Sequence, residues 1–212
     1  MTALIRKALL FLSVLAWISA CAAQTVERIG PAPSDIPDAV RPAIEQKGYR
    51  VSLNKSVAAE LWFTKKLSTT KKDAVGALYP ELSDGEFVGI VSFTQAFTDF
   101  RGQSIPPGAY TLRYQLLPQD GNHLGVAPNP DFLLAIPVAS DAHPEETYPY
   151  KKLVALSAKS TGGSHPAVIA MEGAGEPGTV TKTEAGSVFT VAILAGSGTQ
   201  KIGICLTCSA SQ

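Results

Sequence analysis

The sequence predicts a mainly β protein, with an antiparallel β-sandwich of jelly-roll or immunoglobulin-like type and one or two short helices. Nine segments are rich in β-branched and aromatic residues and are separated by Gly, Pro, Asn and Asp, which is the pattern of short strands joined by turns. A single stretch shows convincing helical periodicity. Strands and helices do not alternate regularly, so the sequence argues against a parallel sheet with crossover helices.

The strand-like segments differ in how clearly they show a two-residue period. Residues 110–117 show it best, because Tyr110, Leu112 and Tyr114 alternate with polar side chains. Alternate residues of a strand point to opposite faces of a sheet, so we expect this strand to have one apolar and one polar face. The nine predicted strands are 49–53, 58–64, 87–97, 110–117, 132–138, 168–171, 179–182, 188–194 and 202–206.

The convincing helix is predicted for residues 150–160. Leu153 and Leu156 share one face at helical spacing, lysines occupy outward positions, and Gly162-Gly163 end the helix. A second helix is predicted within residues 38–47, where Pro42 confines it to one or two turns.

The first residues have the layout of a secretory signal. Arg6 and Lys7 form a short basic region, and residues 8–23 are apolar apart from two serines and one thiol. A membrane-spanning helix needs about 20 apolar residues, and this run ends at Gln24, so it is too short to span a bilayer. We therefore expect the chain to be exported.

Two processing sites fit the end of this signal. The segment Ile18-Ser19-Ala20-Cys21 resembles a bacterial lipobox, in which the cysteine is diacylated and becomes the new N-terminus. The alternative is ordinary cleavage after Ala23, which follows small residues. With the lipobox, the predicted organisation is a signal peptide over 1–20, a Gly- and Pro-bearing tether over 21–35 and a single domain over 36–212.

Charge and composition restrict the classes of partner. The signal takes Arg6 and Lys7 and no acid, so 16 basic and 18 acidic residues remain, a formal charge of −2. The basic residues Lys65-Lys66 and Lys71-Lys72 flank Ser and Thr, which indicates a solvated loop. We expect no nucleic-acid partner, because no Lys/Arg cluster forms a face, and no motif predicts a cofactor.

Two further cysteines lie near the C-terminus. An isolated Cys205-x-x-Cys208 pair in an oxidising compartment is expected to form a disulfide. Redox centres also use C-x-x-C motifs, but they place them between a strand and a helix, whereas this pair ends a predicted strand. The sequence favours a structural disulfide, with thiol-redox chemistry as the alternative.

The long irregular segment 119–131 is a candidate binding loop. Asp120, Asn122 and Asp131 have part of the spacing of an EF-hand calcium loop, but Leu124 stands at a ligand position and the flanks are predicted strands. Ordinary turn chemistry explains these oxygen-bearing side chains, so we do not expect calcium.

The three histidines offer the sharpest candidate for a site. His143 lies in a charged loop, whereas His123 and His165 lie in Gly-rich connections that converge if both fall at one end of a sandwich. Together with Asp120 or Asp131 they would form a metal site. The alternative interpretation is two unrelated turn histidines.

Residues 105–112, Ile-Pro-Pro-Gly-Ala-Tyr-Thr-Leu, contain a P-x-G-x-Y-T-L turn that leads into a strand. On this motif the chain resembles a family of uncharacterised secreted bacterial β-sandwich domains. The resemblance covers about a tenth of the chain. It implies export and a sandwich fold, and it carries over no catalytic residue.

Two functional hypotheses follow from these features. The first is an exported envelope protein, lipid-anchored at Cys21, that binds an envelope protein or an extracellular ligand without catalysis. In that case the residue after the lipidated cysteine is Ala22, and a residue other than Asp at this position resembles a signal for the outer membrane. The periplasm is the alternative location. The second is a metal-dependent periplasmic enzyme that uses His123 and His165.

Overall fold

The computed structural model of the 212-residue chain describes residues 24–70, 74–118 and 129–210. Within these ranges there is one α-helix, α1 (Tyr150–Ala158), and two 3-10 turns, at Arg41–Ala43 and Val138–Ser140. The strands are β1 (Gln24–Ile29), β2 (Gly48–Leu53), β3 (Ser56–Phe63), β4 (Lys66–Leu67), β5 (Phe87–Phe93), β6 (Phe97–Thr98), β7 (Ser104–Ile105), β8 (Gly108–Leu116), β9 (Asp131–Pro137), β10 (Ala167–Glu172), β11 (Val180–Lys182), β12 (Ser187–Ala195) and β13 (Gly198–Cys205).

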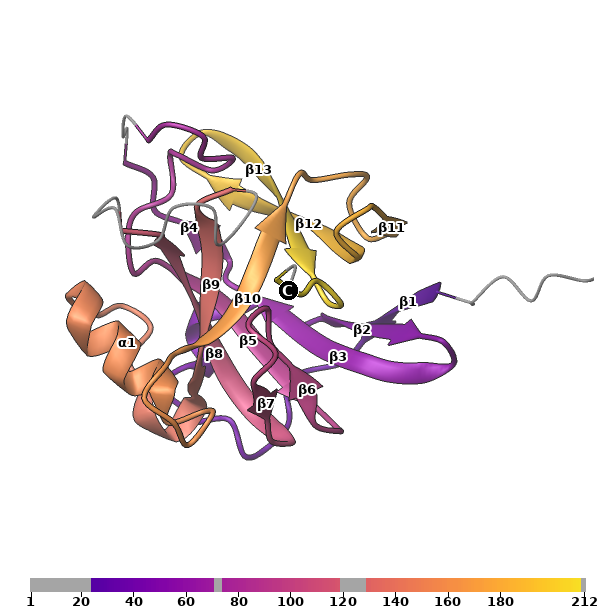
Figure 1. Ribbon diagram of the computed structural model, residues 1–212, viewed down its shortest axis with the longest axis horizontal. Coiled ribbons are helices and arrows are strands. Elements are labelled where there is room, and N and C mark those ends of the chain that lie inside the picture. Colours follow the sequence, from indigo (N-terminus) through magenta and orange to yellow (C-terminus); the bar gives the residue numbers. More distant parts are fainter. Residues whose placement is uncertain (1–23, 71–73, 119–128, 211–212) are drawn as a thin grey trace, which may run out of the picture.

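The main sheet is antiparallel along the order β1-β2-β3-β5-β8-β9-β10-β13-β12-β11 (Figure 1). The turn between β2 and β3 has two residues, Asn54 and Lys55, whose φ values of 53° and 66° are those a type I′ hairpin turn requires. The prediction of a mainly β, antiparallel protein is confirmed, and each of the nine predicted segments contains a strand.

β4 connects the far part of the sheet, at β12, back to the chain that leaves β3. This short strand follows β3 after two residues and pairs in parallel with the end of β12, where Leu194 lies opposite Lys66. β3 therefore borders β5, while its continuation borders β12, and the strands between them form a curved wall. The division into two facing layers that a sandwich requires is not confirmed.

The inside of this wall holds the main hydrophobic core. Side chains from β2, β3, β5, β8, β9, β10, β12 and β13 meet there, and most are fully buried. Tyr49, Phe63 and Phe189 pack together near the end of the wall, with ring centroids 5.2–6.2 Å apart. Burial of this apolar surface is the dominant force that holds the curved sheet together.

Residues 24–35, expected to be a tether, are part of the fold. The first six form β1, which pairs with β2, and the segment that follows lies on the outer face of the sheet, away from the main core. Ile36 and Val40 are buried against that face beside Trp62, whose indole N–H donates to the carbonyl of Gly30 at 2.9 Å. Strand pairing and burial thus fix a segment whose Gly and Pro content indicated a flexible linker.

Helix α1 covers another part of the outer face and confirms the helix predicted for residues 150–160. Leu153 is buried against Phe132 and Leu134 of β9. The hydroxyl of Ser157 donates to the carbonyl of Ala135 at 2.8 Å, which ties the helix to the sheet. The helix predicted within 38–47 is only a 3-10 turn of three residues.

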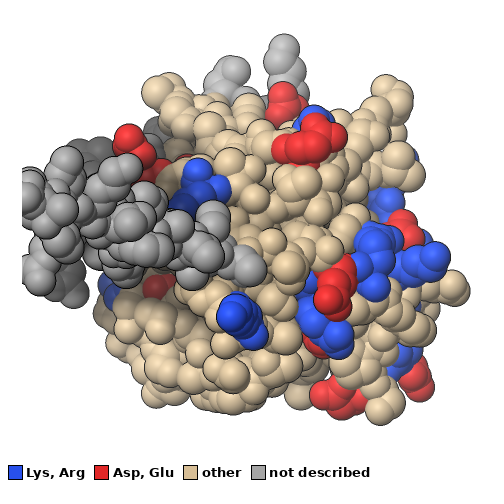
Figure 2. All heavy atoms as spheres, turned by 90° about the vertical axis from the view of Figure 1, so that its right-hand side faces the viewer, with Lys and Arg blue, Asp and Glu red and all other residues tan. Residues whose placement is uncertain are grey.

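The surface carries both signs of charge. Figure 2 shows the side at the right of Figure 1, where lysine and arginine side chains lie with acidic side chains among them. Among the described residues, no helix has the length and the apolar composition needed to cross a membrane.

Candidate functional site

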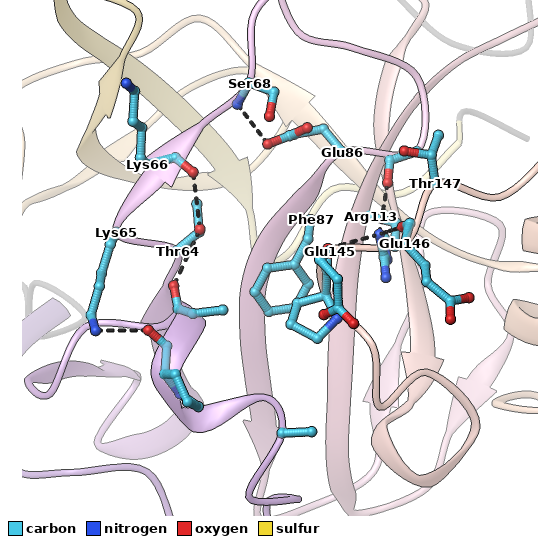
Figure 3. Close-up of a pocket in the computed structure, with 15 residues that line it drawn as sticks. Thr64, Lys65, Lys66, Ser68, Glu86, Phe87, Arg113, Glu145, Glu146 and Thr147 are labelled. Carbon is cyan, nitrogen blue, oxygen red and sulfur yellow. Dashed lines mark hydrogen bonds between the residues drawn. The ribbon is translucent and has the colours of Figure 1, made fainter.

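A cleft of about 510 Å³ opens on the outer face of the sheet (Figure 3). Its floor includes the ring of Phe87 and the side chain of Arg113. We name it the outer-face cleft. Its walls come from four segments that are far apart in the sequence, at residues 39–43, 64–68, 85–87 and 144–147.

Arg113 is held rigid at the cleft by a buried carboxylate. Its Nε donates to Oδ2 of Asp141 at 2.8 Å and its Nη2 to Oδ1 at 2.7 Å, and the two side chains are 1% and 0% exposed. The other donors reach the carbonyl oxygens of Gly85, His143 and Glu146 at 2.7–3.1 Å. All five N–H groups of the guanidinium are used, so Arg113 orders the surrounding loop.

The polar face predicted for residues 110–117 exists, but it is buried. Thr111, Arg113 and Gln115 are at most 5% exposed, because α1 and the loop before it lie over this face. The hydroxyl of Thr111 donates to Oδ2 of Asp141 at 2.6 Å. A buried polar group needs a hydrogen-bond partner, and here Asp141 serves both Thr111 and Arg113.

Opposite charges stand on opposite walls of the outer-face cleft. Lys65 and Lys66 lie on one side of Phe87 in Figure 3, and Glu145 and Glu146 lie on the other, all of them exposed residues. The ion pairs among the described residues do not join the two walls. The two lysines and the two glutamates thus flank the ring of Phe87, which is 4% exposed, while the half-buried Glu86 contacts the lysine-bearing segment at Ser68.

Glu86 is half-buried at the cleft, and its Oε1 accepts the backbone N–H of Ser68 at 2.7 Å. Burial raises the pKa of Glu86 above its ordinary value of 4.5, while the hydrogen bonds from Ser68 and the charge of Arg113 oppose that rise. A carboxyl with a raised pKa in a cleft often marks a functional site, because the protonated form can donate to a ligand.

Several polar groups at the cleft are already engaged within the protein. The hydroxyl of Thr64 lies 3.3 Å and 3.1 Å from the carbonyl oxygens of Ala43 and Lys66, and Arg113 has no N–H to spare. None of the described lining residues is Cys, His or Tyr, so the cleft lacks the pairing of a nucleophile with an imidazole base. What it offers is a set of charges of opposite sign around the nearly buried ring of Phe87.

The predicted metal site is described only in part. Two of its residues, Asp120 and His123, lie outside the described residues, as does Cys21, the predicted lipidation site. Asp131 is 2% exposed, and its carboxylate accepts the backbone N–H groups of Leu78 and Tyr79 at 2.7 and 3.1 Å.

The same carboxylate accepts the hydroxyl of Tyr114 at 2.7 Å, so Asp131 fixes the 78–79 loop to the inner face of β8. Tyr114 is fully buried, and burial together with the nearby Asp131 charge raises the pKa of its phenol. Tyr79 is bound in turn, because its oxygen accepts the N–H of Gly203 at 2.8 Å. Asp131 is thus already engaged by three donors.

The structure does not bring Asp131 and His165 together. β9 and β10 pair in the register that places Ala167 opposite Ala135. By that register Pro137 is level with His165, and the six residue steps from Asp131 to Pro137 span about 20 Å of strand. His165 is exposed, and within the described ranges no three His, Cys, Asp or Glu side chains form a group that could hold a metal ion.

Cys205 and Cys208 lie at disulfide distance, with their Cα atoms 5.6 Å apart. They are 2% and 6% exposed and pack against Ala170 and Val188. Thiol–disulfide exchange needs access to a sulfur atom, so this burial favours the structural role over the redox alternative.

The sequence predicts a solvated loop around Lys65-Lys66 and a charged loop around His143, which includes Glu145 and Glu146, but no local pattern connects the two loops. The lysines and the glutamates are about 80 residues apart in the chain, and only the closed sheet and the Arg113–Asp141 pair bring them to one cleft. The one sequence feature that could have indicated the cleft was the cationic Arg113, which lies on a predicted strand with regular apolar–polar alternation. Comparison of the chain with protein families, with curated proteins and with solved structures gave no match.

Proposed function

We propose that the chain is an exported envelope protein, lipid-anchored at Cys21, that binds a partner in the outer-face cleft without catalysing a reaction. The observation that carries the binding role is the pair of oppositely charged walls around Phe87, above an Arg113 whose donors are all used. The cleft fits a segment of another envelope protein that presents an apolar group between a basic and an acidic side chain. Complementary charge of this kind favours specificity and fast association.

Export and anchoring are supported by two features. The first is the signal layout that ends in Ile18-Ser19-Ala20-Cys21. The second is the buried Cys205–Cys208 pair, since disulfides persist in oxidising compartments such as the periplasm. We place the protein at the outer membrane or in the periplasm.

Mass spectrometry of the mature N-terminus tests the anchor. We expect a chain that begins at Cys21 and carries diacylglycerol, and a Cys21→Ser variant that is neither lipidated nor held in the membrane fraction. A chain that begins at Gln24 without lipid would contradict the lipid anchor but would remain consistent with export. An intact chain that starts at Met1 in the cytosol would contradict both.

Site-specific photo-crosslinking tests the cleft. A photoreactive amino acid at Thr147, on the cleft wall, is expected to yield a discrete crosslinked protein in envelope preparations. Reversal of charge in a Lys65→Glu/Lys66→Glu variant is expected to reduce that product at least fivefold, because the basic wall becomes acidic.

The matched control carries the same photoreactive residue at Lys151, an exposed position on α1 that does not line the cleft. We expect no discrete product from this position. Equal products from both positions, or a Thr147 product unaffected by charge reversal, would rule out the cleft as the binding site.

A further inference from the structure

A second hollow, of about 200 Å³, lies where the wall of strands is incomplete. β11 pairs with β12 as far as Phe189, and β4 pairs with β12 from Leu194 onward. Between these pairings, Ala192 has a strand partner in the described chain only on the β13 side, at Lys201. We name this hollow, which Ala192 lines, the β12 slot.

The backbone of Ala192 faces the open side of β12. The N–H of Thr190 donates to Thr179 at 3.0 Å and its carbonyl accepts the N–H of Gly178 at 2.8 Å, so both groups of Thr190 point toward β11. Backbone groups alternate sides with a period of two residues, and those of Ala192 therefore point the same way. An N–H and a C=O on an open strand edge are the groups with which an extended peptide pairs.

Apolar side chains form one part of the lining of the β12 slot. The rings of Tyr49 and Phe63 line it, with their centroids 6.1 Å apart. Leu194 lines it too, although 59% of this residue is exposed to solvent. An exposed leucine beside two aromatic rings favours a ligand that brings an apolar group of its own.

Positive charge predominates around the slot. Arg28, Lys47 and Lys65 line it, against the single acid Glu45. The guanidinium of Arg28 lies 4.1 Å from the centre of the Tyr49 ring. None of the ion pairs among the described residues uses Arg28 or Lys47, so both cations are available to an anion.

We propose that the β12 slot binds the carboxyl-terminal end of an extended peptide. The peptide backbone pairs with Ala192, its last side chain packs on Tyr49 and Leu194, and its terminal carboxylate meets Arg28 and Lys47. A strand edge, an apolar surface and a pair of cations recognise three different parts of such a chain end. The slot shares Thr64 and Lys65 with the outer-face cleft, but the ligand proposed for it and its test do not depend on the role proposed for that cleft.

Fluorescence anisotropy with dansyl-labelled tripeptides tests the proposal on the full chain, purified in mild detergent. The probes end in Ala, Val, Leu or Phe with a free carboxylate, and matched probes end in a carboxamide. We expect at least one carboxylate probe to bind about tenfold more tightly than its carboxamide, and to weaken as salt screens the cations. Methylation of the backbone nitrogens of that probe is expected to remove binding, because strand pairing needs them.

An Arg28→Gln/Lys47→Gln variant is expected to lose about tenfold in affinity for the carboxylate probe and little for the carboxamide. Lys151→Gln, which removes a cation on α1 away from the slot, is the matched control and should bind as the native chain does. The proposal is overturned if no carboxylate probe binds, if carboxamides bind equally well, or if Lys151→Gln has the same effect as the slot variant.

Discussion

Arg113 and Tyr114 are neighbours on β8 that point to opposite faces of the same sheet, and each donates a hydrogen bond to a buried aspartate. On the outer face, Nη2 of Arg113 lies 2.7 Å from Oδ1 of Asp141. On the inner face, the hydroxyl of Tyr114 lies 2.7 Å from Oδ1 of Asp131. Both contacts fasten a loop to the strand, but the first joins two full charges and the second joins one charge to a neutral donor.

The comparison shows two ways to bury a carboxylate. Asp141 is balanced by a guanidinium whose other donors bind four carbonyl oxygens of nearby loops. Among the described residues Asp131 has no ion-pair partner, and it is held by two backbone N–H groups and one phenol. Removal of one partner should therefore cost more at Arg113, where a buried charge loses its counter-charge, than at Tyr114.

Arg113→Ala is expected to have the largest effect. It leaves the Asp141 carboxylate buried without a counter-charge, and the free energy of unfolding should fall by about 3–5 kcal/mol, measured by urea denaturation. The double variant Arg113→Met/Asp141→Leu removes both charges and should recover most of this loss. A single variant as stable as the native chain would show that the pair does not hold the loop.

Tyr114→Phe is expected to cost less, about 1–2 kcal/mol in the same measurement, because Asp131 keeps both backbone donors. The ring stays in the core, so the variant isolates the hydroxyl. A loss as large as that of Arg113→Ala would remove the distinction between the two aspartates.

Glu172, the last residue of β10, extends the comparison to a carboxyl group with a buried oxygen that has no hydrogen-bond partner among the described residues. This oxygen is Oε1, and burial raises the pKa of the carboxyl above 4.5. The folded state then holds the proton more tightly than the unfolded chain does. Stability from this group is therefore lost as pH rises from 4.5 through the raised pKa.

Glu172→Gln should remove that decline and raise stability at neutral pH relative to the native chain. Urea midpoints between pH 4 and pH 7 would measure it, with Glu184→Gln, at an exposed position, as the matched control. The same pH dependence in both variants would show that Glu172 is not the group responsible.

His165→Ala is expected to have the smallest effect, within about 0.5 kcal/mol, because the residue is exposed. The hydroxyl of Thr161 donates to its backbone carbonyl at 3.0 Å, and alanine retains that acceptor. Metal analysis of both proteins extends the test to the second functional hypothesis. A stoichiometric metal lost in His165→Ala would favour the metal-dependent enzyme over the binding protein.

The nine predicted strands could be recognised because their residue types and turn boundaries are local features of the sequence. β1 could not, because only Val26 and Ile29 are apolar and its order comes from pairing with β2, with Gln24 opposite Leu53. β4 has two residues, too few to show a period. Its role depends on β12, more than 120 residues later, so the closure of the sheet is a nonlocal property.

The candidate sites were harder to predict for the same reason. The sequence predicts a solvated loop at Lys65 and a charged loop around His143 that includes Glu145, and Lys65 and Glu145 are both exposed. What the sequence could not give is the cleft between them, which depends on the Arg113–Asp141 pair. Local residue patterns reported the strands well, whereas contacts between distant segments created the cleft and the β12 slot.

The start of β1 at Gln24 has a consequence for how the molecule would stand on a bilayer. Three residue steps separate Gln24 from Cys21, and even fully stretched they reach only about 11 Å. If Cys21 carries the proposed acyl chains, this short connection would hold the start of β1 within roughly the depth of the lipid headgroups. With this proposed anchor, β1 would be held close to the membrane surface.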